Sequence, residues 1–132
     1  MPGIRPRAGT GDAAVTTRAV AVTTAGDVRE LDLGSGGGQI DALYRAIGSR
    51  DLDMLTVTPQ LLMWVDDQGL VNGSAVNPVA TALLSQMPRL RSQRIRGTVV
   101  FTGATDPDGD VTSLAPEWAR VLHTHPRANE ST

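Results

Sequence analysis

Residues 18–39, RAVAVTTAGDVRELDLGSGGGQ, contain two β-rich segments, a short turn between them and a run of glycines after them. Residues 18–24 alternate alanine with valine and are β-rich, and residues 28–33 mix apolar and polar side chains in near alternation, so both segments are predicted to be strands. Residues 25–27 include a glycine and are too few for a crossover connection, so the second strand returns beside the first as an antiparallel hairpin. A sheet that begins in this way cannot be purely parallel.

Strand and helix patterns continue along the rest of the chain. Asn77 is a favoured N-cap, Pro78 is a favoured first helical residue, and Pro88 ends the helix that they begin. The helix after the glycines has an apolar stripe made of Ile40, Leu43, Tyr44 and Ile47. Helices are predicted at residues 39–47, 78–87 and 113–122, and further strands at residues 52–58, 61–65, 70–71 and 95–102.

The resulting order of elements, ββαββαβα, predicts an α+β fold. We expect one mixed, mainly antiparallel sheet with about three helices packed on one face. Both ends of the chain are rich in small and polar residues. The expected organisation is therefore a flexible N-terminal tail at residues 1–17, a single α+β domain at 18–122 and a flexible C-terminal tail at 123–132.

The composition excludes several classes of function. The chain has no cysteine, which rules out disulfides, thiolate metal sites and cysteine nucleophiles. A net charge of -2 is too small for a DNA mimic or a general DNA-binding protein, and aromatic residues (3%) are too few for base stacking. The longest apolar run is far shorter than the roughly 18 residues of a membrane helix. We therefore expect a cytoplasmic protein that does not enter a membrane.

The glycine run at residues 34–38 resembles the first motif of S-adenosylmethionine-dependent methyltransferases. That cofactor fold needs a doubly wound parallel sheet and a carboxylate at the end of the next strand. Here the next strand ends at Thr58 and Pro59, without a carboxylate. The preferred interpretation is a connector with positive φ angles and no bound cofactor. Binding of a cofactor by Gly36, Gly37 and Gly38 is the alternative.

Two further groups of residues have the spacing of metal ligands. Asp106, Asp108, Asp110 and Glu117 occupy positions 1, 3, 5 and 12 of a possible calcium loop. Glycine falls at position 4 of that loop rather than 6, so a solvated turn is the preferred interpretation. His123 and His125 form an HxH pair with no cysteine and no carboxylate close in sequence. We therefore predict no metal site.

Arginines and a pair of aspartates are the best candidates for binding a partner. Arg89, Arg91, Arg94 and Arg96 place four guanidinium groups within eight residues between a helix and a strand. Guanidinium groups bind phosphates and carboxylates, so the connector suits a phosphate-bearing ligand or an acidic protein surface. Asp66 and Asp67 lie in a tight turn and form a second candidate contact. No catalytic residue is predicted, since the sequence contains no nucleophile elbow.

Four segments, taken in order, resemble a family of small proteins of actinobacteria, their plasmids and phages. They are VDDQGLVNG (65–73), NPVATALLSQ (77–86), IRGTVVFTG (95–103) and TSLAPEWARVL (112–122). The family is the domain-of-unknown-function family DUF3846. The resemblance implies a biological setting and transfers no catalytic residues.

These observations lead to three hypotheses for the function. The first is a non-enzymatic accessory protein of a mobile element that binds a host protein in an anti-defence or regulatory role. The second is a nucleotide or second-messenger sponge in which Gly36 to Gly38, Arg94 and Arg96 hold phosphates at a dimer cleft. The third is a small methyltransferase. A homodimer is expected because a short sheet leaves edges to cover and because LLMWV at 61–65 is very apolar.

Overall fold

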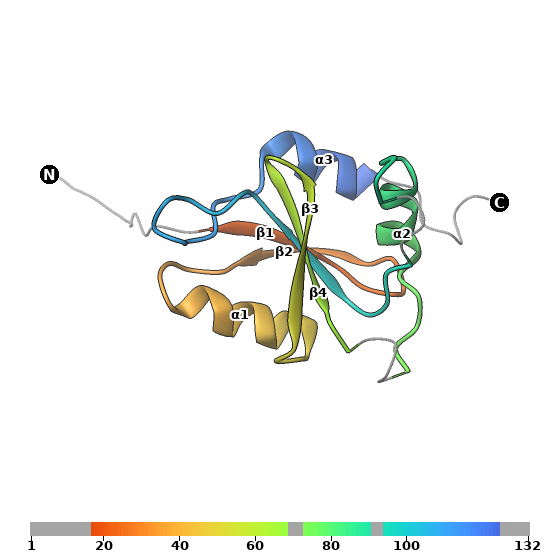
Figure 1. Ribbon diagram of the computed structural model, residues 1–132, viewed down its shortest axis with the longest axis horizontal. Coiled ribbons are helices and arrows are strands. Elements are labelled where there is room, and N and C mark those ends of the chain that lie inside the picture. The colour runs from red at the N-terminus through yellow and green to blue at the C-terminus, as the bar shows by residue number, and fades with distance from the viewer. Residues whose placement is uncertain (1–16, 69–72, 91–93, 125–132) are drawn as a thin grey trace, which may run out of the picture.

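A five-stranded sheet with the order β2-β1-β5-β4-β3 forms the centre of the molecule (Figure 1). The computed structural model describes residues 17–68, 73–90 and 94–124. The strands are β1 (Arg18–Val22), β2 (Val28–Asp32), β3 (Leu52–Thr58), β4 (Leu61–Asp66) and β5 (Val99–Thr102). All neighbouring strands pair antiparallel, so the α+β class and the element order are confirmed, whereas the predicted mixed sheet is fully antiparallel.

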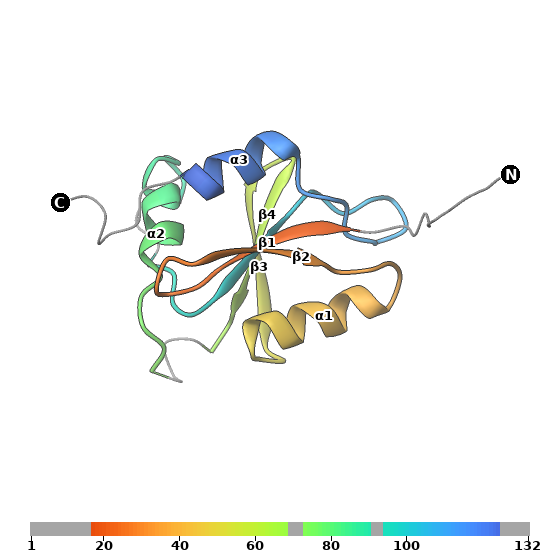
Figure 2. The same cartoon turned by 180° about the vertical axis from the view of Figure 1, so that it is seen from behind.

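Helices cover both faces of the sheet, which corrects the prediction of one covered face. Figures 1 and 2 show α1 (Gly38–Ile47) on one side of the sheet and α2 (Pro78–Ser85) and α3 (Pro116–Thr124) on the other. The physical reason is the burial of all four residues of β5. Val99 and Phe101 contribute to the core beneath α2 and α3, while Val100 contributes to the core beneath α1.

Several element boundaries differ from the predicted ones. The folded part extends beyond 18–122, because Thr17 is buried and His123 and Thr124 belong to α3. The strand predicted at 95–102 begins only at Val99, since Gly97 before it has a φ of 82°. The third helix begins three residues later than predicted. The strand predicted at residues 70–71 lies outside the described residues.

Asn77 ties three segments together beneath α2. Its side chain is fully buried. Oδ1 accepts the N–H of Ala80 at 3.1 Å, which confirms the predicted N-cap. Nδ2 donates to the carbonyl oxygens of Val22 and Gly97, both at 2.9 Å. One amide thus fixes the start of α2 against the end of β1 and the approach to β5.

Gly103 follows β5 at a close contact with residues 112–113. A Cβ atom at this position would lie 2.6 Å from Thr112 Oγ1 and closer still to the carbonyl oxygen of Ser113. Gly103→Ala is therefore expected to lower the free energy of unfolding by about 2 kcal/mol, because backbone has to move to admit the methyl group.

Urea denaturation checks this expectation against the control Gly37→Ala. Gly37 has an ordinary φ of -64°, and a Cβ atom there meets nothing within 4 Å. The control is expected to change stability by about 0.5 kcal/mol or less. Equal stability of the two variants would contradict the close approach of residues 112–113 to Gly103.

Membrane insertion through a helix has no support in the described part of the chain. None of the helices there is long and apolar enough to cross a bilayer.

Candidate interaction surfaces

The glycine run is a loop held in place by the buried side chain of Gln39. Gln39 Nε2 donates to Thr17 Oγ1 at 3.0 Å and to the carbonyl oxygen of Val111 at 2.9 Å. Its Oε1 accepts the N–H of Val111 at 2.8 Å. Thr17 Oγ1 in turn donates to the carbonyl oxygen of Gly34 at 2.6 Å. The start of α1 is therefore bound both to the residue before β1 and to the loop after β5.

Topology further supports the connector interpretation of the glycine run. The strand that enters it, β2, is one edge of the sheet, and the strand after α1, β3, is the opposite edge. A dinucleotide-type site needs these two strands to be parallel neighbours joined by the helix. Gly34 and Gly36 have φ angles of 73° and 60°, so the loop conformation itself requires glycine.

The two parts of the predicted nucleotide site lie far apart within one chain. The glycines follow Asp32, which pairs with Arg18 at the start of β1. Arg94 and Arg96 precede Val99, which pairs with Val22 at the end of β1. The glycine loop and the residues before β5 are therefore at opposite ends of the sheet (Figure 1). A single chain does not bring Gly36, Gly37 and Gly38 together with these arginines.

The arginine connector between α2 and β5 is only partly free. Arg89 and Arg94 are exposed. Arg96 is half-buried, and its Nη1 donates to the carbonyl oxygen of Ser74 at 3.0 Å. Arg91 lies outside the described residues. Two of the four predicted contact residues are thus available as surface guanidinium groups, and a third is held by the backbone of Ser74.

The predicted acidic contact at Asp66 and Asp67 is a turn at the end of β4. Asp66 Oδ1 accepts the N–H of Gln68 at 2.8 Å, which is the hydrogen bond of an Asx turn. Asp67 is exposed. Because Trp64 pairs with Val100, Asp66 lies at the end of the sheet where β5 begins. The acidic turn and the arginine connector thus belong to the same end of the sheet.

The acidic loop at residues 106–110 is a self-contained turn. Asp106 Oδ1 accepts the N–H groups of Asp108 and Asp110 at 2.9 and 3.0 Å. Within the residues that the structure describes, no group of three or more acidic or histidine side chains is arranged to hold a metal ion. Glu117 lies in α3, and His125 lies outside the described residues.

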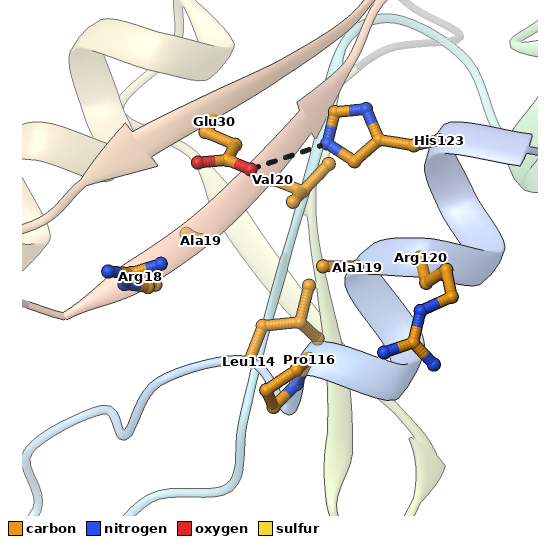
Figure 3. Close-up of a pocket in the computed structure, with 9 residues that line it drawn as sticks. All are labelled: Arg18, Ala19, Val20, Glu30, Leu114, Pro116, Ala119, Arg120 and His123. Carbon is orange, nitrogen blue, oxygen red and sulfur yellow. Dashed lines mark ion pairs between the residues drawn. The ribbon is translucent and has the colours of Figure 1, made fainter.

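A cleft between α3 and the β1–β2 hairpin brings together charged residues that are distant in sequence (Figure 3). Its volume is about 290 Å³. Arg18 lies on the sheet side and Arg120 on the α3 side, and His123 Nε2 lies 3.6 Å from the Glu30 carboxylate. The apolar part of the wall comprises Ala19, Val20, Leu114, Pro116 and Ala119. No local sequence pattern marks this site, because three separate elements contribute to it.

A second groove lies on the opposite face of the same strand, between β2 and α1. Its volume is about 330 Å³. Arg29 contributes from β2 and Arg45 from α1, with Leu31 between strand and helix. β2 is an edge of the sheet, and a groove that carries two arginines lies on each of its two faces. Figure 2 shows the β1–β2 hairpin between α3 above and α1 below.

Comparison with known proteins identifies a family and no activity. The family model described as "Domain of unknown function (DUF3846)" matches residues 17–125. Neither the curated proteins nor the solved structures gave a match. The matched range begins at the buried Thr17 and includes every strand and helix of the fold. The chain therefore belongs to the DUF3846 family.

Proposed function

We propose that this chain is a small non-enzymatic accessory protein of an actinobacterial mobile element, and that it acts by binding a host protein. The observation that carries the proposal is the edge strand β2 with an arginine-lined groove on each face. An edge strand presents unpaired backbone groups, and proteins commonly recognise partners by adding a strand to such an edge.

The charges beside β2 also favour a protein partner. Arg18, Arg29, Arg45 and Arg120 line the two grooves. Within the described part of the chain, no carboxylate forms a salt bridge with any of them. Arginine is enriched at protein interfaces because its planar guanidinium group makes several directed hydrogen bonds at once. Four such groups around one exposed strand suit a polar, charged partner.

The arginine connector and the acidic turn provide a second contact area in this proposal. Arg89, Arg94 and Asp67 are exposed near the far end of the sheet from the glycine loop. Both signs of charge occur there, so a partner that spans the molecule can meet complementary groups at this end as well.

Native mass spectrometry of a tagged copy recovered gently from an actinobacterial lysate tests the proposal. The expected result is a complex with one host protein in stoichiometric amount. Recovery of the bare chain, or of the chain with only a small molecule bound, would count against a protein partner.

A small anionic ligand is the second candidate function, and the α3 cleft favours it. Arg18, Arg120 and His123 surround an apolar wall in a volume of about 290 Å³, close to the lower limit for small-molecule sites. A nucleotide sponge would be stabilised by its ligand, so a thermal-shift screen at millimolar nucleotide is expected to raise Tm. No shift with any nucleotide would remove this candidate.

A further inference from the structure

We infer that β2 receives an extended segment of the partner as a sixth strand of the sheet. We further infer that this segment carries basic residues on the α3 face and acidic residues on the α1 face. The inference rests on the proposed function and names how the partner is recognised. It follows from the direction of the backbone groups of β2, from the side chains on its two faces and from the poor match of the strand to itself.

The hydrogen bonds of the hairpin show which backbone groups of β2 are unused. The N–H of Leu33 donates to the carbonyl oxygen of Thr17 at 2.9 Å, and the N–H of Thr23 donates to that of Asp27 at 2.9 Å. In an antiparallel pair, successive residues point their N–H and C=O groups alternately toward and away from the partner strand. In the register of β1 and β2, where Ala19 pairs with Leu31, Arg29 and Leu31 therefore bond to β1, while Val28, Glu30 and Asp32 direct their backbone groups to the open edge.

The two faces of β2 carry different charges. Glu30 lies on the face of α3, where it meets His123, and Asp32 lies on the same face because side chains alternate along a strand. The Oδ1 atom of Asp32 also accepts the N–H groups of Thr17 and Gly34 at 3.2 and 2.9 Å. Arg29 and Leu31 lie on the face of α1, where they line the second groove with Arg45. Directly beside a sixth strand, β2 itself presents the carboxylates of Glu30 and Asp32 on the α3 face and the guanidinium group of Arg29 on the α1 face. Arg18 on β1, Arg120 on α3 and Arg45 on α1 line the grooves but are not cross-strand neighbours of that strand. Opposite charges directly across a strand pair are stabilising, so the complementary segment alternates basic and acidic residues.

A second copy of the chain fits this edge poorly. Antiparallel pairing of β2 with itself has three registers that align more than one of the outward-facing residues Val28, Glu30 and Asp32. One places Glu30 opposite Glu30, another places Glu30 opposite Asp32 twice, and the third places Arg29 opposite Arg29. Each register sets like charges directly across the strand pair, which is destabilising. The strand is therefore suited to a different chain rather than to a homodimer through this edge.

A proline at position 30 tests the inference directly. Glu30→Pro removes an N–H group that points to the open edge and leaves the hydrogen bonds of Arg29 and Leu31 to β1 in place. The control Glu30→Thr loses the same carboxylate but keeps the N–H. The probe is a synthetic peptide of about seven residues. Lysine occupies the positions that would face α3, and glutamate or valine occupies the positions that would face α1. We expect Glu30→Pro to weaken probe binding at least about ten-fold relative to Glu30→Thr, measured by fluorescence anisotropy.

A charge reversal keeps the test decisive if the proline variant fails to fold. Glu30→Lys retains every backbone group, so it is expected to prefer a peptide that carries glutamate, instead of lysine, on the α3 face. Equal binding of both peptides to wild type and Glu30→Lys would overturn the proposed orientation. Equal probe binding by folded Glu30→Pro and Glu30→Thr would overturn strand addition.

The same variants separate this inference from the proposed function. If wild type and folded Glu30→Pro recover the same host protein in equal amount, strand addition at β2 is wrong and the protein-binding function stands. If wild type recovers no host protein but binds the probe as described, the edge recognises an extended segment and the proposed host-protein function is wrong.

Discussion

Gln39→Ala is expected to lower the free energy of unfolding by about 3 kcal/mol. The substitution leaves the N–H and C=O of Val111 and the hydroxyl of Thr17 without the partner that they have in the native protein. A buried polar group that loses its hydrogen bond costs about 1 to 3 kcal/mol, and three such groups are affected here. Relaxation of the loops and entry of water offset part of the total. Chemical denaturation followed by circular dichroism measures the change.

Gln60→Ala is the matched control for this substitution. Gln60 is an exposed glutamine in the turn between β3 and β4, and its backbone N–H donates to Thr58 Oγ1 at 3.1 Å. It is expected to change stability by about 0.5 kcal/mol or less. If Gln39→Ala were as mild as the control, the glycine loop would be held by something other than this amide.

Asn77→Ala is expected to have an effect of similar size, about 3 kcal/mol. It removes the N-cap of α2 and leaves without a donor the buried carbonyl oxygen of Val22 and the partly buried carbonyl oxygen of Gly97. Loss of an N-cap accounts for about 1 kcal/mol of the change, and the two carbonyl groups account for the rest. Denaturant unfolding with an unchanged m-value measures the loss.

Asn77→Asp distinguishes the cap from the two donated hydrogen bonds. An aspartate keeps an acceptor for the N–H of Ala80 but places a second oxygen against the carbonyl oxygens of Val22 and Gly97. At neutral pH we expect it to be at least as destabilising as Asn77→Ala. If Asn77→Asp were as stable as wild type, the N-cap hydrogen bond alone would account for the contribution of Asn77 to stability.

Local patterns account for the parts of the fold that the sequence could predict. The hairpin of β1 and β2, the cap and proline at the start of α2 and the order of the elements all follow from neighbouring residues. The buried face of α2 also follows from helical spacing, since the apolar residues Val79, Ala80, Leu83 and Leu84 lie on one side of the helix and are all buried. These features depend on residues that are close to one another in the sequence.

The errors occur where distant segments decide the outcome. The helical spacing predicts Ile40 in the apolar stripe of α1, but Ile40 is 40% exposed. The preceding residue, Gln39, is buried instead, because its side-chain amide forms hydrogen bonds with Thr17 and Val111. In α3, the apolar side chain of Val121 is 42% exposed. Side-chain hydrophobicity alone could not predict the burial of Gln39, because its hydrogen-bond partners are 22 and 72 residues away in the sequence.

The candidate surface could not be predicted for a related reason. Its importance depends on β2 being an edge of the sheet, which is a property of the strand order and not of the segment VRELD. The arginine connector, by contrast, is visible in the sequence because its charges are close together along the chain. Arg18, Arg29, Arg45 and Arg120 are separated along the chain and meet around one strand only after folding.

Amide hydrogen exchange along β2, measured by NMR on the labelled chain alone and with its recovered partner, tests the central claim most directly. In the monomeric free chain, the amides of Arg29 and Leu31 are expected to be protected and that of Glu30 to exchange rapidly. In the complex, the amide of Glu30 is expected to become protected as well. A Glu30 amide that is already slow in the free chain, or that still exchanges rapidly in the complex, would contradict recognition of a partner at this edge.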